Sequence, residues 1–468
     1  MKAKKVSHVV LPFVLSLVAL VTSCAYAQGD DSQAQLIKKG EYLAIAADCD
    51  ACHRSPQGQA MAGGRAIASP LGNIIASNIT PSLRAGIGDY SQADFARALR
   101  QGINKQGVHL YPAMPYTSYA KLTDDDIHAL YLYFMHGVKE DDHLTPATHL
   151  AFPFNLRAMM SVWNRLFADP HVFQPQAQAS ALVNRGDYLV NGLAHCDTCH
   201  TPRNALMGAQ ANQGLAGGSV GSWYAPNITP DPIAGIGRWS DDELAEYLTT
   251  GRAGNKAQAA GPMAEAIEQS LQYLRPEDIR AIIAYLRQIP AIKSEQSLAR
   301  DQYGSPADDE ARYRADSQAD AGWKVYASTC ANCHQPNGAG NAFYPALFNN
   351  TATGAENADN LITVILEGVQ RQTQGHPIAM PGYGEQASFT DRLSDQQIAD
   401  VSNYVLKRFG NPQLQVTPQD VAQQRHGGKK PLIASITLSS LLTALVALLV
   451  LGVLAIRFWR KKRSRHVH

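Results

Sequence analysis

The sequence predicts an all-α chain of three tandem helical domains with a C-terminal transmembrane helix. Three observations predict this fold class. One cysteine and histidine motif occurs three times, each copy is followed by an amphipathic helix, and 25 residues near the C-terminus contain no charged side chain. A length of 468 residues also suits about three domains.

Six of the seven cysteines fall into three copies of Cys-x-x-Cys-His, which are Cys49, Cys52 and His53, then Cys196, Cys199 and His200, then Cys330, Cys333 and His334. Cysteines at i and i+3 project from one side of a helical turn, so both sulfurs can reach one edge of a porphyrin. The histidine that follows lies under the ring, where it can ligate iron. The pattern is the attachment signature of c-type haem and predicts three covalently attached haem c groups.

Two other readings of Cys-x-x-Cys are a zinc site and a thioredoxin-like redox pair. A zinc site would need a second pair of Cys or His near each motif, and the sequence has none. A redox pair would not need the histidine that follows every copy. The repeated motif behind an export signal therefore favours haem.

The chain repeats itself around these motifs. A short segment with glycine, aromatic and apolar residues in a similar arrangement precedes each copy. Amphipathic helices are expected at 123–135, 275–286 and 394–409. The first two copies also share Asn-Ile-Thr-Pro, at 78–81 and 227–230, followed by Gly-Ile-Gly. The predicted organisation is a signal peptide at 1–27, cytochrome c-like domains at 28–138, 181–290 and 318–412, an apolar linker at 139–180, a polar linker at 291–317, a linker at 413–430, a transmembrane helix at 431–456 and a basic tail at 457–468.

Methionine is the expected second axial ligand of a haem that carries electrons. Met114 and Met380 stand beside proline in loops before the last helix of their domains, and Met263 occupies the equivalent place in the second. We therefore predict these three as iron ligands. Met61 and Met207 follow their motifs too closely to cross the ring and are assigned to the core. With His and Met on every iron, no position is left open for a substrate.

The two termini predict the location of the chain. A basic stretch, an apolar run from Val9 to Val21 and Ala25-Tyr26-Ala27 form a secretory signal. Cys24 loosely resembles a lipoprotein site, but cleavage after Ala27 would remove it. The uncharged segment Leu432–Ile456 is long enough to span a bilayer, and the basic residues after it place the C-terminus in the cytoplasm. We therefore expect an inner-membrane protein with its haem domains on the periplasmic side.

Charge excludes one class of partner. Eleven of the 41 basic residues lie in the first 27 and last 40 positions, which contain no acid, so the body between them carries a net charge of −10. Such a body is a poor ligand for nucleic acid. No Ser-His-Asp triad, phosphate loop or Rossmann glycine pattern offers a catalytic site, and we expect none.

With these motifs, Tyr-Pro-Ala-Met-Pro at 111–115, Tyr-Phe-Met-His-Gly at 133–137 and Gly-Asp-Tyr-Leu-Val at 186–190, the chain resembles the tri-haem cytochrome c subunits of bacterial membrane-bound dehydrogenases. The resemblance implies a subunit that takes electrons from a catalytic subunit with a flavin or quinone cofactor and passes them to ubiquinone. A small third subunit is a further expected partner. The predicted transmembrane helix favours the gluconate or sugar-acid type over the quinoprotein alcohol type.

Two other functions remain as alternatives. A haem peroxidase would need one iron without a distal methionine, and Met263 is the weakest of the three assignments. A cytochrome subunit of a terminal oxidase would share Cys-x-x-Cys-His, but such chains resemble this one less beyond that motif.

Overall fold

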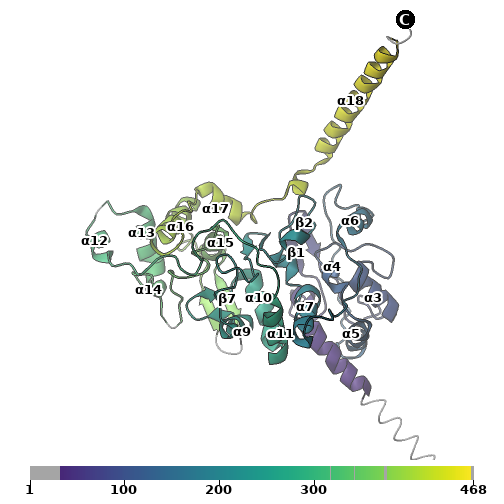
Figure 1. The fold of residues 1–468 in the computed structure, drawn as a ribbon, viewed down its shortest axis with the longest axis horizontal. Coiled ribbons are helices and arrows are strands. Elements are labelled where there is room, and N and C mark those ends of the chain that lie inside the picture. Colours follow the sequence, from purple (N-terminus) through teal and green to yellow (C-terminus); the bar gives the residue numbers. More distant parts are fainter. Residues whose placement is uncertain (1–31, 317, 342, 374–376, 465–468) are drawn as a thin grey trace, which may run out of the picture.

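The computed structural model describes residues 32–316, 318–341, 343–373 and 377–464. Within these ranges the chain is mostly helical and contains four two-stranded antiparallel hairpins. It forms three helical units, called unit 1, unit 2 and unit 3, which follow one another across the molecule (Figure 1). The predicted signal peptide and the last four residues of the predicted basic tail lie outside the described residues.

Each unit opens with a helix that leads into the motif and has a second helix, called the closing helix, that packs on it. Unit 1 consists of a helix at 32–46, α2 (Cys49–His53), β1 (Ala66–Ser69), β2 (Gly72–Ile75), α3 (Gln92–Gln101), α4 (Tyr116–Tyr119) and α5 (Asp124–His136). Unit 2 consists of α7 (Ala181–Tyr188), the π-helix η1 (Leu189–Leu193), α8 (Asp197–His200), η2 (Ala211–Gln213), β3 (Gly218–Val220), β4 (Trp223–Ala225), α9 (Asp241–Thr250), β5 (Arg252–Ala253), β6 (Ala257–Gln258), α10 (Gly261–Gln269), η3 (Leu271–Tyr273) and α11 (Pro276–Leu286). Unit 3 consists of α13 (Ala321–Val325), the π-helix η4 (Tyr326–Cys330), α14 (Ala331–His334), α15 (Asp359–Glu367), β7 (Val369–Gln372), β8 (Pro377–Met380), α16 (Asp395–Phe409) and α17 (Pro418–Arg425). The closing helices are α5, α11 and α16.

A glycine in the opening helix of each unit lets that helix pack directly on the closing helix. A Cβ added to Gly40, Gly186 or Gly322 would lie 2.0–2.2 Å from a backbone carbonyl oxygen of α5, α11 or α16. A larger residue therefore has no room at these positions. The three units share one helix crossing, which explains why a glycine stands in the helix before every motif.

The closing helices begin where the sequence places them. Thr123 caps α5 by accepting a hydrogen bond from the amide of Asp126, and Ser394 forms a capping box with Gln397 at the start of α16. Pro276 is the first residue of α11. These three helices lie within one residue of the predicted ranges.

Units 1 and 2 share one hydrophobic core. Leu43, Leu130, Leu189 and Ile282 belong to the same buried cluster, although they come from the opening and closing helices of both units. Unit 3 has a core of its own, built around Tyr326, the helices α15 and α16, and Val421 of α17.

Two reciprocal hydrogen bonds also join units 1 and 2. The hydroxyl of Tyr42 in unit 1 donates to Asp278 Oδ2 at the start of α11, at 2.6 Å. The hydroxyl of Tyr188 in unit 2 donates to Asp126 Oδ2 at the start of α5, also at 2.6 Å. Each carboxylate is paired with a basic side chain from the opening helix of its own unit, Lys39 with Asp126 and Arg185 with Asp278. The two units therefore contact each other through equivalent surfaces.

Unit 3 meets unit 2 mainly through polar contacts. Glu367 at the end of α15 accepts hydrogen bonds from Ser222 Oγ at 3.0 Å and Trp223 Nε1 at 3.1 Å. Arg371 of β7 is 3% exposed and donates to the carbonyl oxygen of Ala259 at 2.6 Å. These contacts attach unit 3 to the start of β4 and to the residue after β6 in unit 2.

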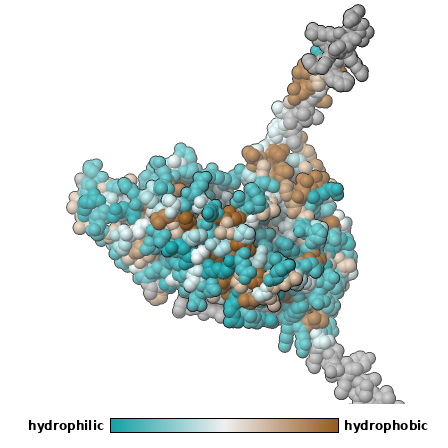
Figure 2. All heavy atoms as spheres, in the orientation of Figure 1, coloured by the Kyte–Doolittle hydropathy of each residue, from teal (hydrophilic) through white to brown (hydrophobic). Residues whose placement is uncertain are grey.

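The apolar linker contains a helix, α6 (Met159–Phe167), that bridges units 1 and 2. Asn164 accepts a hydrogen bond from the hydroxyl of Tyr116, and Trp163 Nε1 donates to the carbonyl oxygen of Leu206. Val162 and Leu166 nevertheless remain more than 60% exposed. Figure 2 shows apolar side chains gathered on the side of the body where α6 and the start of the last helix lie.

The structure corrects the predicted transmembrane helix. No helix within the described ranges is long and apolar enough to cross a membrane. The uncharged segment is not one continuous helix, because Leu432–Ser435 form the 3₁₀ helix η5 and α18 (Leu438–Ser464) begins later and continues into the basic residues. The transmembrane helix at 431–456 is thus wrong. The inner-membrane location with a cytoplasmic C-terminus, which depended on that helix, is wrong with it, and no spanning helix in the described part of the chain supports the predicted membrane contact through Leu432–Ile456.

Candidate haem sites

The three motifs form short helical turns that hold each cysteine pair on one side. Cys49 and Cys52 both belong to α2, whereas Cys196 and Cys330 are the N-cap residues of α8 and α14. All six cysteines are free thiols. Two free sulfurs one turn apart are what attachment to one porphyrin edge requires. The donor sets therefore fit covalently bound haem.

The histidine of each motif is held by a backbone carbonyl. His53 Nδ1 lies 2.6 Å from the carbonyl oxygen of Ser77, and His200 Nδ1 lies 2.7 Å from that of Pro226. His334 Nδ1 lies 3.0 Å from the carbonyl oxygen of Pro345. A hydrogen bond from Nδ1–H fixes the ring and leaves Nε2 to bind a metal.

The protonation of these histidines favours the same role. Burial lowers the pKa of His53, His200 and His334, although the carbonyl hydrogen bond of each ring opposes that shift. The imidazoles are therefore neutral at pH 7, which is the form that ligates iron.

The repeated Asn-Ile-Thr-Pro segments position two of these carbonyls. The Asn78 side-chain oxygen accepts hydrogen bonds from the amide and hydroxyl of Thr80, at 2.9 and 2.7 Å. Asn227 holds Thr229 in the same way, at 2.8 and 2.7 Å. The asparagine follows the histidine's acceptor directly in both units. Sequence reasoning found this repeat but did not assign it the role of fixing the histidine.

The first two motifs lie close together through a tyrosine. The hydroxyl of Tyr119 in α4 donates to the carbonyl oxygen of Ala47 at 2.7 Å, two residues before Cys49. The Tyr119 ring lies edge-on to that of His195, directly before Cys196, with centroids 5.6 Å apart. The pKa of Cys52 is raised to about 11, chiefly by burial and next by the charge of Asp48. Cys199 of unit 2 also contributes to this shift, so the first two motifs are close enough to interact. Sequence reasoning gave no signal for Tyr119.

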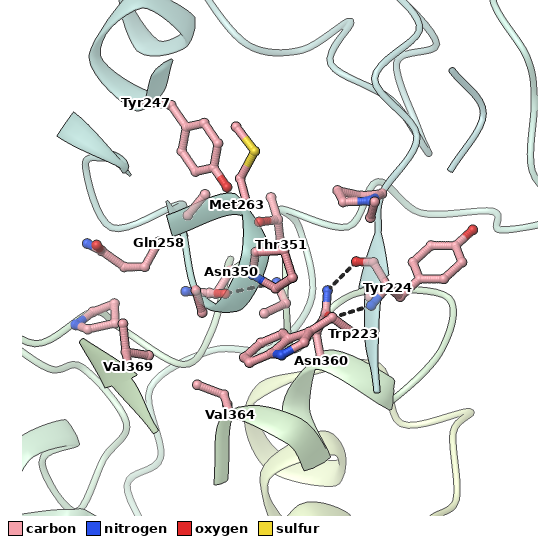
Figure 3. Close-up of a pocket in the computed structure, with 18 of the residues that line it drawn as sticks. Trp223, Tyr224, Tyr247, Gln258, Met263, Asn350, Thr351, Asn360, Val364 and Val369 are labelled. Carbon is pink, nitrogen blue, oxygen red and sulfur yellow. Dashed lines mark hydrogen bonds between the residues drawn. The ribbon is translucent and has the colours of Figure 1, made fainter. Parts of the chain in front are cut away.

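The second and third sites share one cavity of about 410 Å³. Its walls include all eight residues predicted for these two sites, namely Cys196, Cys199, His200 and Met263 from unit 2 and Cys330, Cys333, His334 and Met380 from unit 3. Figure 3 shows Met263 beside Tyr247 on one side of the cavity and Val364 and Val369 of unit 3 on another. The lining is mainly apolar, as a porphyrin requires. The structure thus brings the predicted residues of units 2 and 3 into one space.

Met114 of unit 1 lies outside this cavity. It sits in the loop before α4, half-buried against the core shared by units 1 and 2. Its amide donates to the carbonyl oxygen of Tyr111, and its own carbonyl accepts from the amide of Tyr116. Met61 is buried in the same core, in agreement with its assignment as a packing residue.

A helical unit that presents two spaced cysteines and a fixed histidine to an apolar space is a cytochrome c. The Cytochrome c family description matches residues 183–290 and 319–408, which correspond to units 2 and 3. The chain is 46% identical over 450 residues to the fructose dehydrogenase cytochrome subunit of Gluconobacter japonicus, covering 92% of both chains. It is 40% identical over 429 residues to the gluconate 2-dehydrogenase cytochrome c subunit of Pantoea cypripedii, covering 88% of this chain and 94% of the relative. It is 38% identical over 419 residues to the alcohol dehydrogenase (quinone) cytochrome c subunit of Gluconobacter oxydans, covering 86% and 84%.

The chain therefore belongs to the family of the cytochrome c subunits of dehydrogenases. Membership confirms the resemblance drawn from the motifs. It implies covalently bound haem c and a role in electron transfer.

Proposed function

We propose that this chain is the electron-transfer subunit of a dehydrogenase complex and carries electrons through three haem c groups from a catalytic subunit to ubiquinone. The observation that carries this proposal is the spatial order of the motifs. Tyr119 lies between the first and second, and one cavity contains the second and third. Adjacent redox sites in one chain suit electron relay, and the substrate chemistry belongs to the partner subunit.

In this proposal the chain's own residues have three roles. The six cysteines of the motifs would attach the cofactors, and His53, His200 and His334 would ligate the iron. Met114, Met263 and Met380 would supply the second ligand and so leave no iron position open to small molecules. Haem, when bound, supplies reversible one-electron chemistry. The apolar cavity walls of units 2 and 3 exclude water and so favour high potentials.

We infer that the catalytic partner oxidises a sugar or sugar acid. The sequence favoured a gluconate-type complex only through the transmembrane helix, which the structure contradicts, so this choice rests on the relatives. Identity is 46% to the fructose dehydrogenase subunit, compared with 40% and 38% for the gluconate and alcohol subunits. Fructose is therefore the first substrate to test. A small third subunit remains part of the proposed complex.

Reduction of the haem bands by a substrate tests this function. The purified complex is mixed separately with fructose, gluconate, sorbitol, glucose and ethanol, and absorbance of the reduced bands is followed. We expect one of the first two to reduce all three haems and added ubiquinone to reoxidise them. The isolated chain should reduce with none. Direct oxidation of a substrate by the isolated chain would contradict the proposal.

Carbon monoxide tests the distal methionines. The reduced wild-type protein should not bind carbon monoxide, whereas Met114→Ala, Met263→Ala and Met380→Ala should each open one haem to it. Met61→Leu is the matched control and should stay closed. If the wild type binds carbon monoxide strongly at one haem, the methionine assignment for that unit is wrong and the result supports the peroxidase alternative.

A further inference from the structure

The linker between units 2 and 3 supplies a buried arginine to the second haem site. Arg300 is 7% exposed. Its Nη2 lies 3.3 Å from the carbonyl oxygens of Asn227 and Gly235, both in the loop that fixes His200. Its own backbone carbonyl packs against Gly354 of unit 3, where an added Cβ would lie 2.0 Å from that oxygen. The residue is therefore locked between the two units.

Arg300 forms no ion pair within the described residues, although the carboxylates of Asp301 and Glu356 act on its charge. Its Nε is buried without a hydrogen-bond partner. The neighbouring carboxylate of Asp301 is paired with Arg238 at 3.2 Å and Lys256 at 3.7 Å instead. A buried guanidinium with only carbonyl partners is costly, and an anion that supplies the missing acceptor would relieve that cost.

The missing anion can come from the cavity itself. Arg300 lines the cavity that contains Cys196, Cys199, His200 and Met263. Haem attached through its vinyl edge carries two propionate carboxylates on the opposite edge. Carboxylates are the anions that a guanidinium recognises best, through short charge-assisted hydrogen bonds.

We propose that Arg300 anchors the haem of unit 2 by donating a hydrogen bond from its guanidinium to one of its propionates. This inference rests on the proposed function, since it requires haem at the second site. A fixed positive charge beside that haem stabilises the reduced iron, which carries one positive charge fewer. Arg300 therefore sets the second potential above the value that the axial ligands alone would give.

Neither of the segments that follow the closing helices of units 1 and 3 supplies an equivalent arginine. The linker after unit 1 contains no arginine between 139 and 156, although Asp141 takes the place of Ile292 as acceptor for the loop asparagine. The segment after α16 of unit 3 has no arginine before Arg425 of α17, which pairs with Asp395. The effect of Arg300 should therefore fall on one haem of the three.

A redox titration of the full-length protein tests the proposal. Arg300→Gln removes the charge, Arg300→Lys keeps it, and Arg238→Gln is the control, because it removes an equal charge from an exposed side chain outside the cavity. Covalent haem per chain is measured first. We expect Arg300→Gln to lower the equilibrium constant for reduction of one haem about tenfold, which corresponds to a reduction potential lower by about 59 mV for one electron. Arg300→Lys should recover most of this loss, and Arg238→Gln should change no wave by a comparable amount.

The outcomes separate this inference from the proposed function. Fewer than three haems in the wild-type protein would overturn the proposed function itself. Three haems with unchanged potentials in Arg300→Gln would overturn only the role of Arg300. An equal decrease of the potential in Arg300→Gln and Arg300→Lys would show that the side chain acts by packing and would overturn the role of its charge. Met380→Gln marks the wave of the third haem, and an Arg300→Gln effect on that same wave would overturn the assignment to unit 2.

Discussion

Units 1 and 2 are joined differently from unit 3, although all three share one helix crossing. The first two units bury a common core and exchange equivalent tyrosine–aspartate hydrogen bonds. Unit 3 keeps a separate core and meets unit 2 through Glu367, Arg371 and the shared cavity. Repeats of one fold can therefore form either a fused pair or an attached neighbour. The apolar surface that they share decides which.

Glycine at the helix crossing gives the strongest test of this difference. Gly186→Val would place side-chain atoms on the backbone of α11, and we expect a loss of about 3 kcal/mol in the free energy of unfolding. Because the core is shared, units 1 and 2 should lose protection together in hydrogen exchange. Gly322→Val should affect unit 3 alone. If unit 1 stays protected in Gly186→Val, the two units are not one cooperative structure.

The reciprocal tyrosines give the next largest effect. Tyr188→Phe removes a hydrogen bond to the buried carboxylate of Asp126, so we expect a loss of about 1–2 kcal/mol from the stability of the pair. Tyr42→Phe should cost a similar amount through Asp278. Thermal unfolding measures the loss of stability in each variant, and hydrogen exchange shows which units lose protection. Equal destabilisation of unit 3 would argue against a contact confined to the pair.

Acid should weaken the pair through Asp278. Burial alone would raise the pKa of this carboxyl, but hydrogen bonds from Arg185 and Tyr42 outweigh burial and lower it. The carboxyl has a pKa of about 3.9 in the unfolded chain and a lower one in the folded protein. The ionised carboxylate therefore stabilises the folded state above about pH 3.9, and this stability is lost as the pH falls through the folded pKa. The stability difference between wild type and Asp278→Asn, on the order of 1 kcal/mol, should therefore shrink below about pH 4. Unit 3 carries Gln397 at the equivalent helix position and should show no such dependence there. A difference that stays constant down to pH 3 would refute this link.

The polar contact between units 2 and 3 gives the smallest effect. Glu367→Gln replaces one of the two carboxylate oxygens that accept from Ser222 and Trp223, and we expect a cost of about 0.5–1 kcal/mol. Hydrogen exchange should increase at the β4 strand and the end of α15, while the core of unit 1 stays unchanged. Increased exchange throughout unit 1 would mean that unit 3 supports the pair more than its contacts indicate.

Local sequence patterns predicted the closing helices well but not the C-terminal segment. Thr123 and Ser394 are strong caps, so the starts of α5 and α16 could be located within one residue. The uncharged segment after residue 431 was predicted as one spanning helix from its composition alone. Composition does not specify where a helix begins, and the chain starts α18 only at Leu438. The segment 291–317 was predicted only as a polar linker, yet it contains the buried Arg300, which no local pattern distinguishes.

The sequence by itself determined the chemistry of attachment. Two cysteines and a histidine act within one helical turn, so their spacing alone predicts what they hold. Only the tertiary structure decided which motifs are neighbours, how units 1 and 2 fuse, and where Arg300 lies. Those features depend on contacts between residues far apart in the chain, such as Tyr42 with Asp278. A hydrophobic pattern shows which side chains are buried but not the partners that bury them.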